Sequence, residues 1–103
     1  MIRNLPKRFF PEPLEFEWDE GNAGKNRKHD VEDMECEEVF FDERKVALRD
    51  TLHSDKEERF ILLGKTKTGR LLYLVFTTHG HKLRVISARD INRKEIFLYE
   101  EKT

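Results

Sequence analysis

Apolar residues in the second half of the chain gather in three short runs, at residues 60–63, 71–76 and 83–86. The runs are rich in Val, Ile, Leu, Phe and Tyr, which favours short strands over helices. Turn-forming residues around Gly69 and Gly80 separate the runs. The pattern predicts three antiparallel strands joined by two short connections.

Residues 15–18 alternate polar and apolar side chains, which predicts a short strand. Asp19 then offers an N-cap for a helix over residues 20–28. That helix is weak alone, because Gly21 and Gly24 each cost about 1 kcal/mol relative to alanine. We expect tertiary contacts to hold this helix, and we expect its polar face to carry a function.

Two more helices and a strand are predicted further along the chain. Residues 31–41 place apolar side chains on one side and acidic side chains elsewhere, as in an amphipathic helix. Residues 46–51 alternate again and predict a further strand. Near the C-terminus, Asn92 and Glu95 have the spacing of a capping box, so we expect a last helix to begin at Asn92.

The order of these elements predicts one α+β domain over residues 14–103, with helices on one face of the sheet and the other face partly open. Residues 1–13 contain all three prolines of the chain and no periodicity, so we expect an irregular N-terminal arm. Phe9 and Phe10 either dock this arm on the domain or leave it loose.

Charge is segregated along the chain, although the net charge is only −1. Residues 12–58 hold 17 Asp and Glu against 7 Lys and Arg, whereas residues 59–94 hold 9 Lys and Arg against Asp90 alone. This asymmetry predicts a basic face that meets an anion or an acidic partner. Pairing of opposite charges across the fold is the alternative explanation.

Charged residues make up 40% and hydrophobic residues 37% of the 103 residues, which suits one domain with a modest core. Cys36 is the sole cysteine, so we expect no intramolecular disulfide and no cysteine-based zinc site. The sequence has neither a signal-peptide pattern nor an apolar run of the ~20 residues that span a membrane. We therefore expect a cytoplasmic protein that needs no membrane, metal ion or other cofactor.

Several short motifs follow one another in a fixed order along residues 14–101. They are Phe16-Glu-Trp-Asp19, Lys25-Asn26, Lys28-His29, Glu35-Cys-Glu-Glu-Val-Phe-Phe41, His53-Ser54, Glu57-Glu-Arg-Phe60, Leu63-Gly-Lys65, Gly69-Arg-Leu-Leu72, Val75-Phe-Thr77, Arg84-Val-Ile-Ser-Ala-Arg89, Lys94-Glu95 and Tyr99-Glu100. In this order and spacing the motifs resemble the BrnT family of toxins.

The resemblance implies a RelE-like fold, with two N-terminal helices, an antiparallel sheet of three to four or more strands, and a C-terminal helix. It implies an endoribonuclease toxin of a type II toxin–antitoxin module, in which the ribose 2′-hydroxyl attacks the adjacent phosphate without a metal. The implied partner is a BrnA-like DNA-binding antitoxin, through which alone the toxin meets DNA. The chain departs from the family pattern in the shorter segment 26–29, at Asp30 where glycine is common, and at Ile96 and Phe97 where arginines are common.

Metal-free RNA cleavage needs a positive charge that stabilises the pentacoordinate phosphate. Arginine suits this task because it stays charged and binds phosphate through two parallel hydrogen bonds. A period of two places Arg59 on a strand face with Ile61 and Leu63, and Arg89 on one with Val85 and Ser87. Each arginine stands at one end of a predicted strand, which makes the two the first catalytic candidates. The same period places Arg84 on the opposite face from Arg89, with Ile86 and Ala88. Ion pairs with nearby carboxylates are the competing explanation for these arginines.

Two further side chains are catalytic candidates for proton transfer. His53 has the chemistry of a general acid or base near neutral pH. Tyr99 is suited to stack on a base or donate a proton, as tyrosines do in this superfamily. A solvated loop for His53 and a core position for Tyr99 are the structural alternatives. A third set holds cations expected to bind the RNA backbone without reading its sequence, namely Lys65, Lys67, Arg70, Arg84, Lys25 and Lys28.

Three functions stay open at this point. An RNA-cleaving toxin is the leading hypothesis. A non-catalytic module that binds nucleic acid or an acidic partner on a basic sheet face is the second, and a structural partner that only sequesters a DNA-binding protein is the third. Cleavage of RNA in EDTA and toxicity on expression distinguish them.

Overall fold

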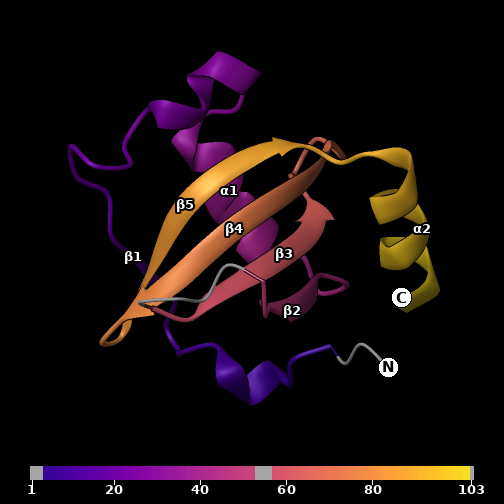
Figure 1. Ribbon diagram of the computed structural model, residues 1–103, viewed down its shortest axis with the longest axis horizontal. Helices are drawn as coiled ribbons and strands as arrows, with labels where there is room; N and C mark the ends of the chain where they lie inside the picture. The colour runs from indigo at the N-terminus through magenta and orange to yellow at the C-terminus, as the bar shows by residue number, and fades with distance from the viewer. Residues whose placement is uncertain (1–3, 53–56, 103) are drawn as a thin grey trace.

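The computed structural model describes residues 4–52 and 57–102 of the chain. A five-stranded sheet forms its centre, with helix α1 (Asp33–Phe40) on one face and helix α2 (Arg93–Lys102) at one end of the other face (Figure 1). The strands are β1 (Glu15–Phe16), β2 (Val46–Asp50), β3 (Arg59–Lys65), β4 (Leu71–His79) and β5 (Lys82–Asp90). Two short 3-10 helices, η1 (Lys7–Phe9) and η2 (Lys25–His29), lie in the first third of the chain.

The sheet has the order β1-β5-β4-β3-β2. Strands β2 to β5 form an antiparallel meander, which confirms the three predicted strands and the further strand predicted at residues 46–51. Strand β1 pairs with β5 in parallel, so the sheet is mixed and not purely antiparallel. Gly69 and Gly80 occupy the two turns with φ of 91° and 61°, a region that favours glycine.

The prediction of a helix over residues 20–28 is wrong, so in the described part of the chain one α-helix precedes the meander where two were expected. Residues 20–24 form turns, and only the short η2 follows. The Asp19 carboxylate accepts a hydrogen bond from the Gly21 N–H at 2.8 Å, which favours a local turn. Gly24 has φ of 69°, and a residue in this left-handed conformation interrupts a helix.

Two buried asparagines from this segment complete the edge of β5. The Asn22 amide donates to the Val85 carbonyl at 3.1 Å, and the Ala88 N–H donates to the Asn26 side-chain oxygen at 2.9 Å. Strand β1 is only two residues long, so the rest of this edge needs other partners. The tertiary contacts that were expected to hold this segment are therefore hydrogen bonds from the asparagine side chains to backbone groups of β5.

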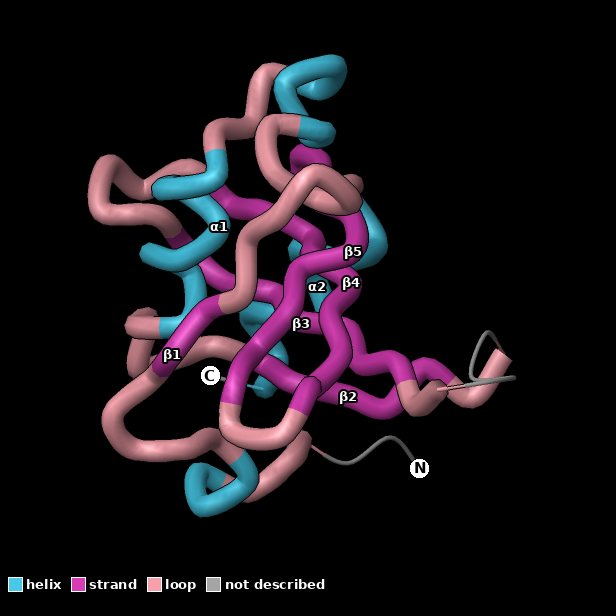
Figure 2. Tube along the Cα trace, turned by 90° about the vertical axis from the view of Figure 1, so that its left-hand side faces the viewer, coloured by secondary structure: helices cyan, strands magenta, loops and turns pink. Residues whose placement is uncertain are grey.

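Helix α1 confirms the helix predicted over residues 31–41, within shorter bounds. It begins with a capping box formed by Glu32 and Glu35. Its apolar side packs on β3 and β4 and builds the main core with the sheet. Figure 2 shows the helix beside the sheet. Gly64 permits this approach, because a Cβ at that position would lie 2.8 Å from Cγ1 of Val39.

Residues 4–13 of the N-terminal arm are docked on the main core. Phe10 is only 9% exposed, and the ring of Phe9 packs edge-on against Phe60 with centroids 4.8 Å apart. The Leu5 N–H donates to the carbonyl of Ala47 at 2.7 Å, which ties the arm to the outer edge of β2. The arm therefore forms part of the layer that covers one face of the sheet.

A second, smaller core lies on the opposite face, where α2 packs against β3. It consists of Val46, Leu48, Leu63 and Tyr99. The predicted capping box at the start of α2 is confirmed, because Asn92 and Glu95 exchange two hydrogen bonds of 2.9 Å between side chain and backbone. No helix within the described ranges is both long and apolar enough to cross a bilayer.

Candidate active site on the open sheet face

Among the described residues, α2 covers only one end of the sheet face opposite α1 (Figure 1). Side chains of β3, β4 and β5 that point away from the main core make up the rest of this face. We call this region the open face. It is formed by Arg59, Ile61, Tyr73, Val75, Thr77, Arg84, Ser87 and Arg89.

A β-bulge in β5 decides which arginines belong to the open face. The register shifts between Val75, which pairs with Ser87, and Phe76, which pairs with Val85, so Ile86 is the extra residue. Val85 and Ala88 are three residues apart, yet both are buried in the main core. The predicted placement of Arg84 beside Ala88 is therefore wrong, because the bulge turns Arg84 onto the face that carries Arg89.

Arg89 is held rigidly on the open face. Its guanidinium carbon lies 4.0 Å from the centroid of the Tyr73 ring, within the range of a cation–π interaction. Its two terminal nitrogens donate to the two carboxylate oxygens of Glu95 at 2.9 and 2.8 Å. Glu95 is itself fixed by the capping box of α2, so the start of that helix positions Arg89.

The electrostatics around Arg89 keep its neighbours in defined protonation states. Burial alone would raise the pKa of Glu95, but hydrogen bonds from Arg89 and from the Asn92 N–H outweigh it and lower that pKa. Burial, followed by the negative charge of Glu95, raises the pKa of Tyr73. Glu95 thus stays ionised and Tyr73 stays protonated at neutral pH.

Arg84 is held by carboxylates from the segment that follows β1. It donates to Glu17 at 2.9 Å and to the two oxygens of Asp19 at 2.8 and 3.0 Å. Hydrogen bonding to Asp19 is the main cause that raises the pKa of Arg84. Glu17 also lies 2.9 Å from Nδ1 of His79, so these four side chains form one cluster at the β1 end of the open face.

Arg59 lies closer to Arg84 than to Arg89. Phe60 of β3 pairs with Phe76 of β4, so the preceding residue, Arg59, lies opposite Thr77. Thr77 in turn pairs with Arg84 of β5 on the other side of β4. Two strand spacings separate the Cα atoms of Arg59 and Arg84, or about 10 Å. Arg89 pairs with Tyr73, which lies four residues before Thr77 on β4. The Cα atoms of Arg89 and Arg59 are therefore about 16 Å apart. The two first candidates thus share the open face, and their backbone positions stand apart along it.

The family model described as "Ribonuclease toxin, BrnT, of type II toxin-antitoxin system" matches residues 18–95. The chain belongs to the BrnT family. The matched range includes α1, the whole β2–β5 meander and every arginine of the open face. A search of curated proteins found no match to the chain.

Of the two proton-transfer candidates of this BrnT protein, the structure describes Tyr99, which is buried away from the open face. Tyr99 is 4% exposed in the second core, and its hydroxyl donates to Asp42 at 2.8 Å. Burial, and then this hydrogen bond, raise the pKa of Tyr99 strongly. We therefore assign Tyr99 a structural role. His53 lies outside the described residues.

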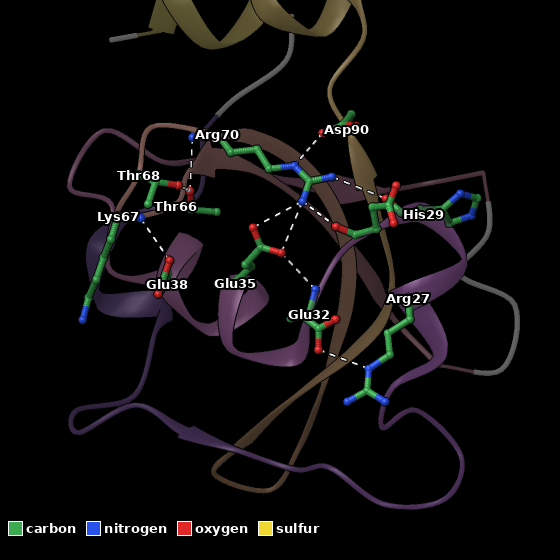
Figure 3. Close-up of polar contacts among 11 residues, drawn as sticks. Arg27, His29, Glu32, Glu35, Glu38, Thr66, Lys67, Thr68, Arg70 and Asp90 are labelled. Carbon is green, nitrogen blue, oxygen red and sulfur yellow. Dashed lines mark hydrogen bonds and ion pairs between the residues drawn. The ribbon is translucent and has the colours of Figure 1, made fainter.

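Arg70 ties three parts of the fold together (Figure 3). Its Nε donates to Asp90 at 2.8 Å, and its Nη1 donates to the Asp30 carbonyl at 2.6 Å and to the Glu35 carboxylate at 3.2 Å. These contacts join β5, the end of η2 and α1, and hydrogen bonding to Asp90 is the main cause that raises the pKa of Arg70. The arginine therefore serves as a structural clamp.

The lysines expected to bind RNA lie at separate places on the BrnT surface. Lys65 is exposed at the end of β3, and Lys67 is exposed in the next turn with its side chain directed away from the Arg70 clamp (Figure 3). Lys25 and Lys28 are exposed on η2, which packs beside β5. Lys65 alternates with Gly64 and so lies on the open-face side of the sheet, whereas Lys67 lies in a turn and Lys25 and Lys28 lie on η2.

Opposite charges pair across the fold, as the alternative explanation of the charge segregation proposed. The acidic half supplies Glu17 and Asp19 to Arg84, and Glu35 to Arg70. The pairing partners are 65 and 67 residues apart for Arg84, so no local sequence signal marks them. In residues 4–52 and 57–102, no group of three or more His, Cys, Asp or Glu side chains is arranged to hold a metal ion.

The structure adds Tyr73 and Glu95 to the candidate site. Tyr73 had a usable signal, because it alternates with the buried Leu72 and Leu74 and so belongs to the opposite face. The sequence indicates only a capping role for Glu95, because its contact with Arg89 depends on the direction that α2 takes after β5.

Proposed function

We propose that this BrnT toxin is a metal-independent endoribonuclease that binds and cleaves RNA on the open face. The ribose 2′-hydroxyl would attack the adjacent phosphate, and the arginines would stabilise the charge that develops on it. The observation that carries this proposal is Arg89, a half-exposed guanidinium fixed between Tyr73 and Glu95 on an accessible sheet face. A preorganised donor of this kind contributes about 2.7–4 kcal/mol to a transition state.

Arg89 retains free donors despite its ion pair. A guanidinium carries five N–H groups. Within the described structure, the contacts of Arg89 with Glu95 and the Asp90 carbonyl use three of them. Two N–H groups thus stay available to a phosphate without loss of the contact that positions the side chain.

The arginines would act on different phosphates of one strand. Arg59 and Arg84 lie on either side of Thr77, whereas Arg89 lies about 16 Å from Arg59, further along β4. Because Tyr73 and Glu95 fix its guanidinium, we assign Arg89 to the phosphate that reacts and the Arg59–Arg84 pair to a neighbouring one. Contacts of the second kind position RNA without reading its sequence.

Tyr73 is the group on the open face best suited to donate a proton near Arg89. Its raised pKa keeps the phenol protonated at neutral pH, and its ring already contacts the guanidinium. We propose that Tyr73 donates a hydrogen bond to the leaving oxygen. His53 stays a proposed acid or base from the sequence alone.

We further propose that a BrnA-like antitoxin neutralises the toxin in the cytoplasm, and that the toxin meets DNA only through this partner. Membership of a type II toxin–antitoxin family supports an antitoxin partner and an RNA substrate.

RNA cleavage in EDTA by the purified, antitoxin-free protein tests the proposal. We expect cleavage products that end in a 2′,3′-cyclic phosphate, and we expect Arg59→Ala and Arg84→Ala to weaken cleavage. Arg8→Ala is the matched control, because Arg8 is an exposed arginine of η1 on the side of the sheet that the arm covers. Intact RNA with correctly folded wild-type protein would overturn the proposal.

A non-catalytic RNA-binding module is the second candidate, and the carboxylates that hold Arg84 and Arg89 favour it. Its signature would be RNA binding that weakens steeply with salt while no products form.

A further inference from the structure

A groove separates the N-terminal arm from the end of α1. Its volume is about 690 Å³, which is within the range of sites that hold drug-sized ligands. The arm and α1 both pack on the main-core face of the sheet, so the groove and the open face lie on opposite sides. Its apolar lining consists of Phe10, Pro11, Pro13, Leu14, Phe40 and Phe41.

Phe41 stands at the edge of this groove with most of its ring in solvent. It follows α1 directly and is 64% exposed, and its ring centroid lies 6.4 Å from that of Phe16. Exposure of a large aromatic ring beside an apolar groove is costly in water and typical of a surface that binds a partner. Met34 of α1 is similarly exposed but does not line the groove. It therefore serves as a comparison for the effect of a new charge at Phe41.

Two lysines, Lys7 and Lys45, line one part of the groove, together with the exposed Glu43. The Lys45 ammonium lies 4.9 Å from the centroid of the Phe10 ring, and burial, followed by repulsion from Lys7, lowers the pKa of Lys45. Within residues 4–52 and 57–102, neither lysine has a carboxylate oxygen within 4 Å. This contrasts with Arg84 and Arg89, which both have carboxylate partners.

Glu12 and Glu43 also reach the groove, but both are exposed. Water and salt screen an exposed charge more than a half-buried one. Lys45 is the least exposed of the four charged side chains that line the groove, so its charge is the least screened. An apolar lining with a partly dehydrated cation at one end is complementary to a segment that carries bulky apolar side chains and a carboxylate.

We propose that this groove anchors a segment of the antitoxin that presents two or three large apolar side chains next to an Asp or Glu. The identity of the partner rests on the proposed function, whereas the chemistry of the segment rests on the groove. Because the groove lies behind the sheet, the segment holds the antitoxin on the toxin without contact with Arg89. Loss of the anchor therefore weakens the complex and leaves the ribonuclease activity of the free toxin unchanged.

The test measures binding of the purified toxin to the protein encoded by the adjacent gene, by titration calorimetry at two salt concentrations. We expect Phe41→Asp to weaken binding at least ~30-fold, as for an aromatic hot spot. We expect Lys45→Glu to weaken it ~10-fold, with a larger effect at low salt, and Lys45→Arg to bind like wild type. Met34→Asp places the same new charge on an equally exposed apolar residue of α1 and should leave the affinity unchanged.

Thermal unfolding and RNA cleavage are measured on every variant. The proposal is supported if Phe41→Asp and Lys45→Glu stay folded, keep the activity of the free toxin and lose the antitoxin. It is overturned if both bind as tightly as Met34→Asp, or if the wild type does not bind the neighbouring gene product. Binding without any RNA cleavage by the wild type would instead count against the proposed function and leave the groove result standing.

Discussion

Replacement of Glu95 by glutamine tests how Arg89 is held. The Glu95 carboxylate accepts two hydrogen bonds from Arg89, at 2.9 and 2.8 Å, and one from the Asn92 N–H at 2.9 Å. An amide of the same size retains one acceptor oxygen, so it keeps the cap but cannot bind the guanidinium through two charged oxygens. Glu95→Gln therefore loosens Arg89 while α2 stays in place.

The expected magnitude follows from these contacts and their exposure. A hydrogen bond to a charged group contributes about 1.5–3 kcal/mol, but the Arg89 side chain is 41% exposed and solvent screening weakens the pair. We expect Glu95→Gln to lower the free energy of unfolding by about 1–2 kcal/mol. We expect a loss of about tenfold in the rate of RNA cleavage, equivalent to about 1.4 kcal/mol of transition-state stabilisation.

Asn92→Ala is the matched control, because it removes the other half of the capping box and leaves the Arg89–Glu95 ion pair intact. Loss of an N-cap costs about 1 kcal/mol of stability. Urea unfolding and cleavage of a fluorescent RNA are measured for both variants. If Glu95→Gln and Asn92→Ala reduce cleavage equally, or if neither reduces it, the positioning of Arg89 by Glu95 is refuted.

The same carboxylate predicts a pH dependence of stability. The pKa of Glu95 is lowered in the folded protein, so its ionised form favours the folded state at any pH above the pKa of the unfolded chain. This contribution is lost as the pH falls from the ordinary glutamate value, near 4.5, through the lower folded value. Glu95→Gln should therefore destabilise the protein at pH 7 and have less effect near pH 3. An unchanged difference between the variants at the two pH values would contradict this assignment.

Three further substitutions test the scaffold. Gly64→Ala should lower the free energy of unfolding by about 1–3 kcal/mol, because its Cβ would lie 2.8 Å from Val39, and unchanged thermal unfolding would contradict this close contact. Tyr99→Phe removes the hydroxyl that donates to Asp42. We expect the free energy of unfolding in urea to fall by about 1–3 kcal/mol, while the folded protein cleaves RNA fully. Loss of cleavage without loss of stability would return Tyr99 to the active site. Arg70→Ala breaks the clamp, in which the arginine side chain is only 25% exposed. It should lower the free energy of unfolding by about 2 kcal/mol or more. An RNA-binding defect without any loss of stability would show that Arg70 contacts RNA instead.

The strands of the meander could be predicted from sequence because their signals are local. Each apolar run is bounded by turn residues, and Gly69 and Gly80 indeed adopt positive φ. The cap of α2 was equally local, since Asn92 and Glu95 are three residues apart. Signals of this range depend on backbone geometry alone and survive whatever the rest of the chain does.

The features that sequence analysis missed depend on contacts between distant segments. The turns at residues 20–24 replace the expected helix because Asn22 and Asn26 bind the edge of β5, more than sixty residues away. The bulge at Ile86 reverses the face of Arg84, and the sequence around it has no glycine to mark the irregularity. A strict period of two therefore gave the correct strand but the incorrect face for one arginine.

Cleavage of RNA by Arg89→Ala and Arg89→Lys in EDTA tests the central claim most directly. The measured quantity is the rate at which ends with a 2′,3′-cyclic phosphate form, relative to wild type, for variants with native thermal unfolding. A fixed guanidinium at the reacting phosphate predicts a loss of about 10²–10³-fold for alanine, and little recovery with lysine, which neither stacks on Tyr73 in the same way nor binds phosphate through a planar fork. Wild-type rates from either folded variant would contradict the assignment of the open face as the ribonuclease site.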